Sequence, residues 1–318
     1  MEPFLYVFAV NDYPVPEQIR AMARKEKLVP LSLRTRIHES GETVESSLYL
    51  TKGFSLASQT GRRSLYEDRP IWDIPFKITY AGSKTERRAS FITPKPTTNH
   101  VTVAALQEGP VAIVLYEADL KDSEQRVARL RLDIEPRDGG MCDEIVVAGR
   151  PYDHSAIEIQ PGTVIGWRVA GTLVAVRLLR SRGLKSGQPD SVGYCLGPVA
   201  EGGLCLDCPL ADESSTPVRH NDLNAGFAVA CSTTAEHSSL AEFLKIFGDW
   251  PLIEKTEPAE RDIRWQAGTT AMALQWSSAG NRIIERSING QPVTFRLLYD
   301  SPSMHLAEGD IPDVARDP

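Results

Sequence analysis

Apolar and polar residues alternate along much of the chain, which is the pattern of strands with one buried face. The alternation is clearest in residues 71–80 (IWDIPFKITY) and 127–134 (VARLRLDI). Further β-rich runs occupy residues 100–106, 111–117, 144–149, 163–171, 172–179 and 226–231. Gly, Pro, Asp and Asn separate many of these runs, as in a sandwich. The pattern therefore predicts an all-β fold, namely a large, mostly antiparallel β-sandwich of two sheets with one or two accessory helices.

Helical signals are confined to two short segments. Residues 14–27 begin with Pro14 and Pro16 and place apolar residues at helical spacing. Residues 239–247 open with the Ser-x-x-Glu spacing of a capping box and continue with an apolar stripe. Near the end of the chain, Asn289-Gly290 lies between two alternating runs and predicts a two-residue hairpin turn.

No linker divides the chain into separate units. We expect one sandwich domain over residues 31–306, preceded by a helical or extended segment over residues 1–30. Residues 307–318 are acidic and punctuated by proline, so a flexible tail is expected there. Residues 183–226 lack a clear period and are rich in Gly, Pro, Ser and Asp, which predicts a long loop inside the domain.

Charge and cysteine content narrow the choice of partners and compartment. The chain has 35 basic and 42 acidic residues, a net charge of −7, which argues against nucleic acid as the main partner. No apolar run approaches the roughly 20 residues of a membrane span, and Glu2 stands where a secretion signal carries a basic residue. The odd count of five cysteines predicts reduced thiols in a cytoplasmic protein. The sequence is also compatible with a homodimer.

Several segments, in this order, resemble the C-terminal β domain (the supersandwich) of the heparinase II/III-like polysaccharide lyases. The segments that resemble the family are residues 46–76 (SSLYLTKGFSLASQTGRRSLYEDRPIWDIPF), 91–96 (FITPKP), 164–179 (VIGWRVAGTLVAVRLL), 238–247 (SSLAEFLKIF), 263–276 (IRWQAGTTAMALQW) and 287–293 (SINGQPV). The resemblance implies a sandwich that binds an acidic saccharide.

One departure from the family affects the expected chemistry. These lyases place an α/α-toroid before the sandwich, and their active site lies between the two parts. Only some forty residues precede the first predicted sandwich strand here, so we expect the toroid to be missing. The family's toroid residues for proton transfer are therefore not assigned to this chain.

The richest cluster of polar and aromatic residues lies between residues 38 and 73. Trp and Tyr rings stack on sugars, Arg pairs with carboxylates, and a nearby Tyr or His can transfer protons. The candidate catalytic residues are His38, Tyr49 and Tyr66, and the candidate ligand-binding residues are Glu67, Arg69, Trp72 and Asp73. The alternative interpretation is that Tyr49 and Trp72 are core residues and that the others form a solvated turn.

The cysteines suggest a second kind of site. Cys205 and Cys208 form a Cys-x-x-Cys pair, and Cys195 lies ten residues before it. Two thiolates from one tight turn are a common half of a structural zinc site, although the usual second pair is missing. Free thiols in a loop and a core strand, or a redox pair, are the alternatives. Apart from this structural zinc we expect no cofactor.

Three functions remain open at this stage. The first is a stand-alone, lyase-like sandwich that binds an acidic saccharide and acts, if it is an enzyme, by proton abstraction. The second is an intracellular cyclase, isomerase or lyase that uses the sandwich for a small molecule bound in a closed apolar pocket. The third is a non-catalytic interaction module with an extended apolar surface.

Overall fold

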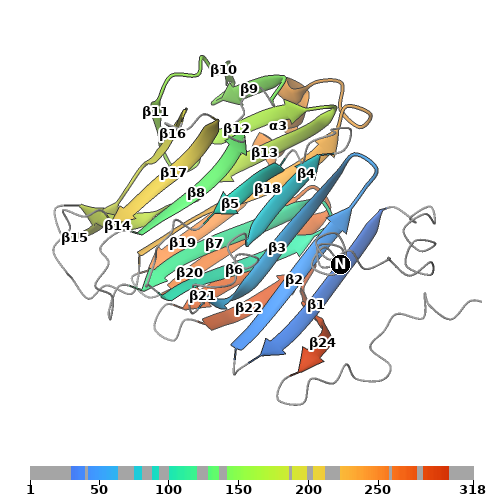
Figure 1. Cartoon of the computed structure of the whole chain (residues 1–318), viewed down its shortest axis with the longest axis vertical. Helices are drawn as coiled ribbons and strands as arrows, with labels where there is room; N and C mark the ends of the chain where they lie inside the picture. Colours follow the sequence, from blue (N-terminus) through green and yellow to red (C-terminus); the bar gives the residue numbers. More distant parts are fainter. Residues whose placement is uncertain are drawn as a thin grey trace, which may run out of the picture.

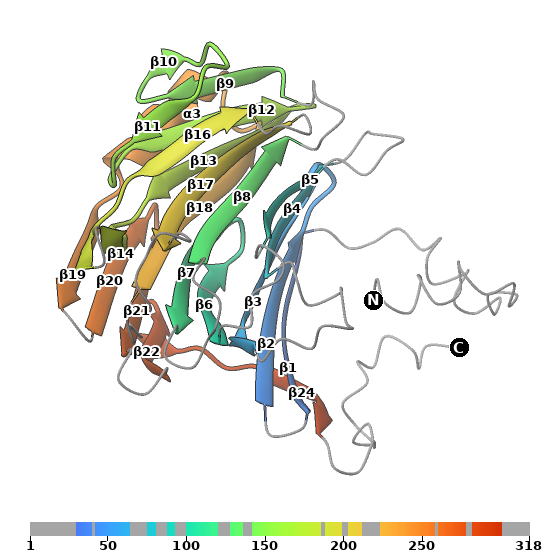
Figure 2. The same ribbon diagram turned by 60° about the vertical axis from the view of Figure 1, so that its left-hand side comes forward.

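The computed structural model describes residues 30–39, 42–63, 75–80, 88–92, 100–119, 128–135, 142–185, 188–198, 203–211, 223–257, 260–277 and 282–300. These residues form mostly antiparallel strands and a single helix, so the prediction of an all-β sandwich is confirmed. The N-terminal helix and the acidic tail expected from the sequence lie outside the described residues. Figures 1 and 2 show three layers of sheet, which we call sheets A, B and C.

Sheet A forms one outer layer. Its neighbouring strands, in spatial order, are β24 (Arg296–Asp300), β1 (Leu31–Glu39), β2 (Glu42–Leu50), β3 (Phe54–Arg63), β4 (Phe76–Tyr80), β5 (Arg88–Ile92), β8 (Ala128–Glu135), β17 (Leu204–Ala211), β16 (Tyr194–Pro198) and β11 (Ile157–Ile159). All pairs are antiparallel except β24 with β1, which is parallel. We call the edge formed by β24, β1 and β2 the wing.

Sheet B is the middle layer. It continues from the end of β3 through β6 (His100–Glu108), β7 (Val111–Asp119), β18 (Leu223–Thr233), β13 (Thr172–Leu178), β12 (Val164–Val169), β9 (Glu144–Val147) and β10 (Arg150–Pro151), and a short hairpin of β14 (Arg182–Lys185) and β15 (Gln188–Ser191) extends from β18. Residues 61–63 of β3 pair with β6, so this one strand joins the two sheets. Gly61 suits the crossing because a Cβ there would lie 3.1 Å from the carbonyl oxygen of Thr43.

Sheet C forms the third layer. It contains β19 (Leu252–Glu257), β20 (Glu260–Ala267), β21 (Thr270–Ser277), β22 (Arg282–Ile288) and β23 (Gln291–Pro292). One apolar core fills the space between sheets A and B, and a second fills the space between sheet B and sheet C with helix α3 (Leu240–Asp249). The sequence prediction of two sheets therefore lacked this third layer, which the alternating runs after residue 250 build on the back of sheet B.

The three-layer arrangement explains why the hydrophobic pattern differs between segments. Sheet B is covered on both faces, so residues 111–118 of β7 and 223–232 of β18 are buried without interruption. A strand buried on both faces has no reason to alternate. Strands β8 and β20 lie in outer layers with one face towards a core, and they show the expected alternation.

Residues 183–226 do not form the predicted long loop. The chain there makes β14, β15, β16 and β17 and enters β18, although residues 186–187, 199–202 and 212–222 lie outside the described part. Strands β14 and β15 have four residues each and β16 has five, and β17 is buried at most positions on both sides. Neither property produces the long two-residue alternation by which strands are found in a sequence.

Two local predictions are confirmed. Asn289 and Gly290 both have positive φ angles, 51° and 75°, as a type I′ turn between β22 and β23 requires. Ser239 caps α3, and its hydroxyl accepts a hydrogen bond from the backbone N–H of Glu242 at 3.1 Å. The Glu242 carboxylate reaches back to Ser238 rather than to the cap residue itself.

Candidate functional site

The residues predicted from the sequence lie in two groups. Tyr66, Glu67, Arg69, Trp72 and Asp73 fall outside the described residues. The other two candidates, one on β1 and one on β2, are described. The structure therefore bears on only part of the predicted catalytic set.

His38 and Tyr49 lie on neighbouring strands but at opposite ends of them. His38 is in register with Thr43 of β2, and Tyr49 comes six residues after Thr43. Six residues of extended strand span about 20 Å. These two residues are therefore too far apart to act on the same bond of a substrate. Tyr49 is partly buried beside Phe54, and burial together with the charge of Glu236 raises its pKa.

The three candidate zinc ligands also fail to converge. Cys205 and Cys208 are three residues apart on β17, a strand and not a tight turn, so their side chains point to opposite faces of sheet A. Cys195 is on β16, where it is in register with Asp207. Burial raises the pKa of Cys205 to about 11 and that of Cys208 to about 12, which disfavours the thiolate form that a metal binds. In the described ranges no three His, Cys, Asp or Glu side chains are grouped as metal ligands.

A different set of charged residues meets at the wing. Arg34 and Arg36 are two residues apart on β1, so their side chains share one face of the strand. That face turns towards β6 of sheet B and β22 of sheet C, because Arg34 contacts Glu108 and Arg36 shares a carboxylate with Arg286. We call Arg34, Arg36, Glu45, Glu108 and Arg286 the wing cluster.

Glu45 lies at the centre of the wing cluster. One of its oxygens accepts from Arg36 Nε at 2.9 Å and from an Arg36 terminal nitrogen at 2.5 Å. The other oxygen accepts from Arg286 at 2.5 Å. The side chains of Glu45 and Arg286 are each only 10% exposed, whereas that of Arg36 is 43% exposed. Glu45 is thus a fixed counter-ion, whereas the Arg36 side chain is partly in solvent.

Arg34 occupies the other half of the wing cluster. It forms an ion pair with Glu108 and donates to the backbone carbonyl of Gln107 at 3.1 Å. Gln107 is itself anchored, because its side chain accepts from the Ser58 hydroxyl at 2.7 Å and donates to the Leu56 carbonyl at 2.9 Å. The backbone that receives Arg34 is therefore held rigidly against β3.

The chain segment between sheets C and A closes the wing cluster on one side. Figure 2 shows this segment leaving β22 and crossing to β24 beside β1. Its residue Phe295 lies under two guanidinium groups, with 4.4 Å from its ring centre to Arg286 Cζ and 6.0 Å to Arg36 Cζ. Such cation–π contacts orient the two arginines further.

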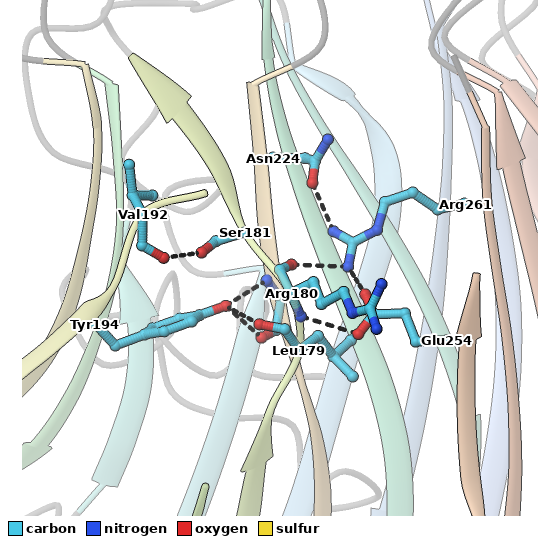
Figure 3. A network of polar contacts seen from close by, with 9 residues as sticks. Leu179, Arg180, Ser181, Val192, Tyr194, Asn224, Glu254 and Arg261 are labelled. Atoms are coloured by element: carbon cyan, nitrogen blue, oxygen red, sulfur yellow. Dashed lines mark hydrogen bonds and ion pairs between the residues drawn. The ribbon is translucent and has the colours of Figure 1, made fainter. Parts of the chain in front are cut away.

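A second polar cluster lies between sheets B and C (Figure 3). Arg261 of β20 donates to the Asn224 side chain at 2.7 Å and to the Arg180 carbonyl at 2.8 Å, and it pairs with Glu254 of β19. Glu254 also accepts from the backbone N–H of Arg180 at 2.9 Å. Burial lowers the pKa of Arg261 to about 10, so the guanidinium remains charged at neutral pH.

A small cavity adjoins this buried cluster. Its volume is about 10 Å³, and it is lined by Arg261, Glu117 of β7 and Trp276 of β21, among others. That volume holds about one water molecule. The cavity is thus too small for an organic substrate, and the surrounding charges link sheet B to sheet C.

The sequence contains a signal for the wing cluster just before residues 38–73, the segment in which the site was predicted. In residues 31–39 (LSLRTRIHE), Arg34 and Arg36 are separated by one residue, so a strand places these two basic side chains in one row. Arg286, which shares the Glu45 carboxylate with Arg36, is 241 residues away from Glu45 in the chain. Only the third layer brings it to this row.

Searches of family models, curated proteins and solved structures found no match to this chain. In the described part of the chain, no helix has the length and apolarity that crossing a membrane would require.

Proposed function

We propose that this protein binds an acidic saccharide, or a related carboxylate ligand, at the wing cluster. The observation that supports the proposal most is the Arg36 side chain, which is 43% exposed while its guanidinium is held by Glu45 and lies over the Phe295 ring. A preordered arginine binds a carboxylate with little loss of side-chain entropy. Three arginines against two glutamates leave one positive charge in excess within the wing cluster.

The choice of ligand class rests on two lines of support. The sequence resembles the β domain of heparinase II/III-like lyases, and a guanidinium cluster suits the carboxylates of uronic acids. An elimination reaction would need a base and an acid close to the same sugar bond. Because His38 and Tyr49 are about 20 Å apart along the strands, we propose binding and include no elimination step.

Titration with polygalacturonate tests the proposal, with neutral dextran as the control ligand. The wild-type protein should bind polygalacturonate, and added salt should weaken the binding because the contacts are ionic. Arg36→Ala should weaken it about tenfold or more, the value of a hydrogen bond between charged groups. Isothermal titration calorimetry at two salt concentrations measures both effects.

Arg264→Ala is the matched control for the loss of one positive charge. Arg264 is 55% exposed and pairs with Asp262 and Glu285 on β20 and β22 of sheet C. The Arg264→Ala variant should have nearly the same affinity for polygalacturonate as the wild-type protein. Absence of binding by the wild-type protein, or equal losses in the two variants, would refute the proposal.

A further inference from the structure

The two glutamates of the wing cluster differ in how firmly they are held. Glu45 is nearly buried and has an arginine on each oxygen. Glu108 has an ion pair with one arginine, and its side chain is 40% exposed. If Glu45 moved away, Arg286 would be left buried without a counter-ion, which is costly in free energy. Glu108 can move into solvent at a small cost in free energy.

The position of Glu108 favours such a movement. It is the last residue of β6, directly before the turn at Gly109, where φ is +51°. Arg34 does not depend on it for its position, because the guanidinium also donates to the carbonyl of Gln107. If the Glu108 carboxylate leaves, Arg34 stays at the wing, and the terminal nitrogen that donated to both groups can donate to another carboxylate.

We infer that Arg34 receives one carboxylate of the ligand and that Glu108 occupies the same place when no ligand is bound. This inference rests on the proposed function. A ligand carboxylate has the same charge and shape as the Glu108 carboxylate, so one replaces the other on the same donors. Glu108 is thus a built-in competitor that weakens binding and excludes neutral ligands, which cannot replace its charge.

The inference predicts a gain of affinity from the loss of one carboxylate. Glu108→Gln keeps the size of the side chain but gives Arg34 only a neutral partner. Affinity for polygalacturonate should rise about two- to fivefold, since an exposed ion pair of this strength no longer has to be broken. Titration calorimetry at fixed salt measures the change, and dextran serves again as the neutral ligand.

Glu285→Gln is the matched control for the general gain of positive charge. Glu285 is 42% exposed and lies 3.9 Å from Arg264 on sheet C, so its environment parallels that of Glu108. Its variant should change the affinity much less than Glu108→Gln does. In an Arg34→Ala background, Glu108→Gln should give no gain, because the donor for which the two carboxylates compete is gone.

The possible results separate the inference from the proposed function. If the wild-type protein does not bind polygalacturonate, both are overturned. If it binds and Arg36→Ala weakens binding, but Glu108→Gln binds no more tightly than Glu285→Gln, only the inference is overturned. A gain by Glu108→Gln that persists in the Arg34→Ala background also overturns it.

Discussion

Arg261 and Arg34 each pair with a glutamate of another strand, but the two pairs have opposite surroundings. The side chains of Arg261 and Glu254 are 3% and 8% exposed, whereas those of Arg34 and Glu108 are 30% and 40% exposed. Breaking the first pair leaves a charge in a medium of low dielectric constant, and breaking the second leaves it in water. The same two residue types can therefore fasten two sheets in one region and stay exchangeable in another.

Arg261→Met should have the largest effect on stability. The substitution leaves Glu254 buried without its cation and removes the link to Asn224 of sheet B. Loss of one partner of a buried pair costs about 3–5 kcal/mol of the free energy of unfolding. Urea unfolding followed by tryptophan fluorescence measures it, since Trp276 lies at the same cavity.

Arg264→Met is the control on the same strand, three positions further along β20. Its side chain is exposed, so the expected change is within about 1 kcal/mol. Similar losses in Arg261→Met and Arg264→Met would show that burial does not separate the two kinds of pair.

Glu45→Gln should have an intermediate effect, because Glu45 is nearly buried but lies at the edge of the sandwich. Its two oxygens serve two arginines, and a neutral amide can satisfy only part of their donors. We expect a loss of about 1.5–3 kcal/mol, the value of a hydrogen bond to a charged group. A thermal or urea unfolding curve measures it against Glu285→Gln, and an unchanged midpoint would contradict the fixed role of Glu45.

The fold class could be predicted from the sequence because alternation is a local property. Strands such as β8 and β20 have one face towards a core, so apolar and polar residues alternate in their sequence. The third layer could not be predicted in this way. The strands of sheet C show the same alternation of apolar and polar residues as the strands of any outer sheet. The sheet against which they pack is determined by contacts between residues far apart in the chain. The continuous apolar runs of β7 and β18 were the available signal for a sheet covered on both sides.

The candidate site was harder to predict for the same reason. The spacing of Cys205 and Cys208 suggested a metal-binding turn, but both residues lie on a strand. Residues three apart on a strand point to opposite faces. Residue types also do not show which of the two glutamates is buried. The basic row of Arg34 and Arg36 was visible in the sequence, but the difference between Glu45 and Glu108 depends on three sheets meeting at the wing.

Arg34→Met should have the smallest effect on stability and a clear effect on binding. Its partner Glu108 is exposed and keeps its solvation after the substitution, so the free energy of unfolding should change by no more than about 1 kcal/mol. The same variant should lose affinity for polygalacturonate, because the donor proposed for the ligand carboxylate is gone. Unfolding curves and titration calorimetry on one preparation measure both quantities. A loss of stability as large as that of Arg261→Met would place Arg34 with the buried residues that fasten sheets together. A stable variant with weakened binding would separate the exchangeable pair at the wing from the fixed pair between sheets B and C.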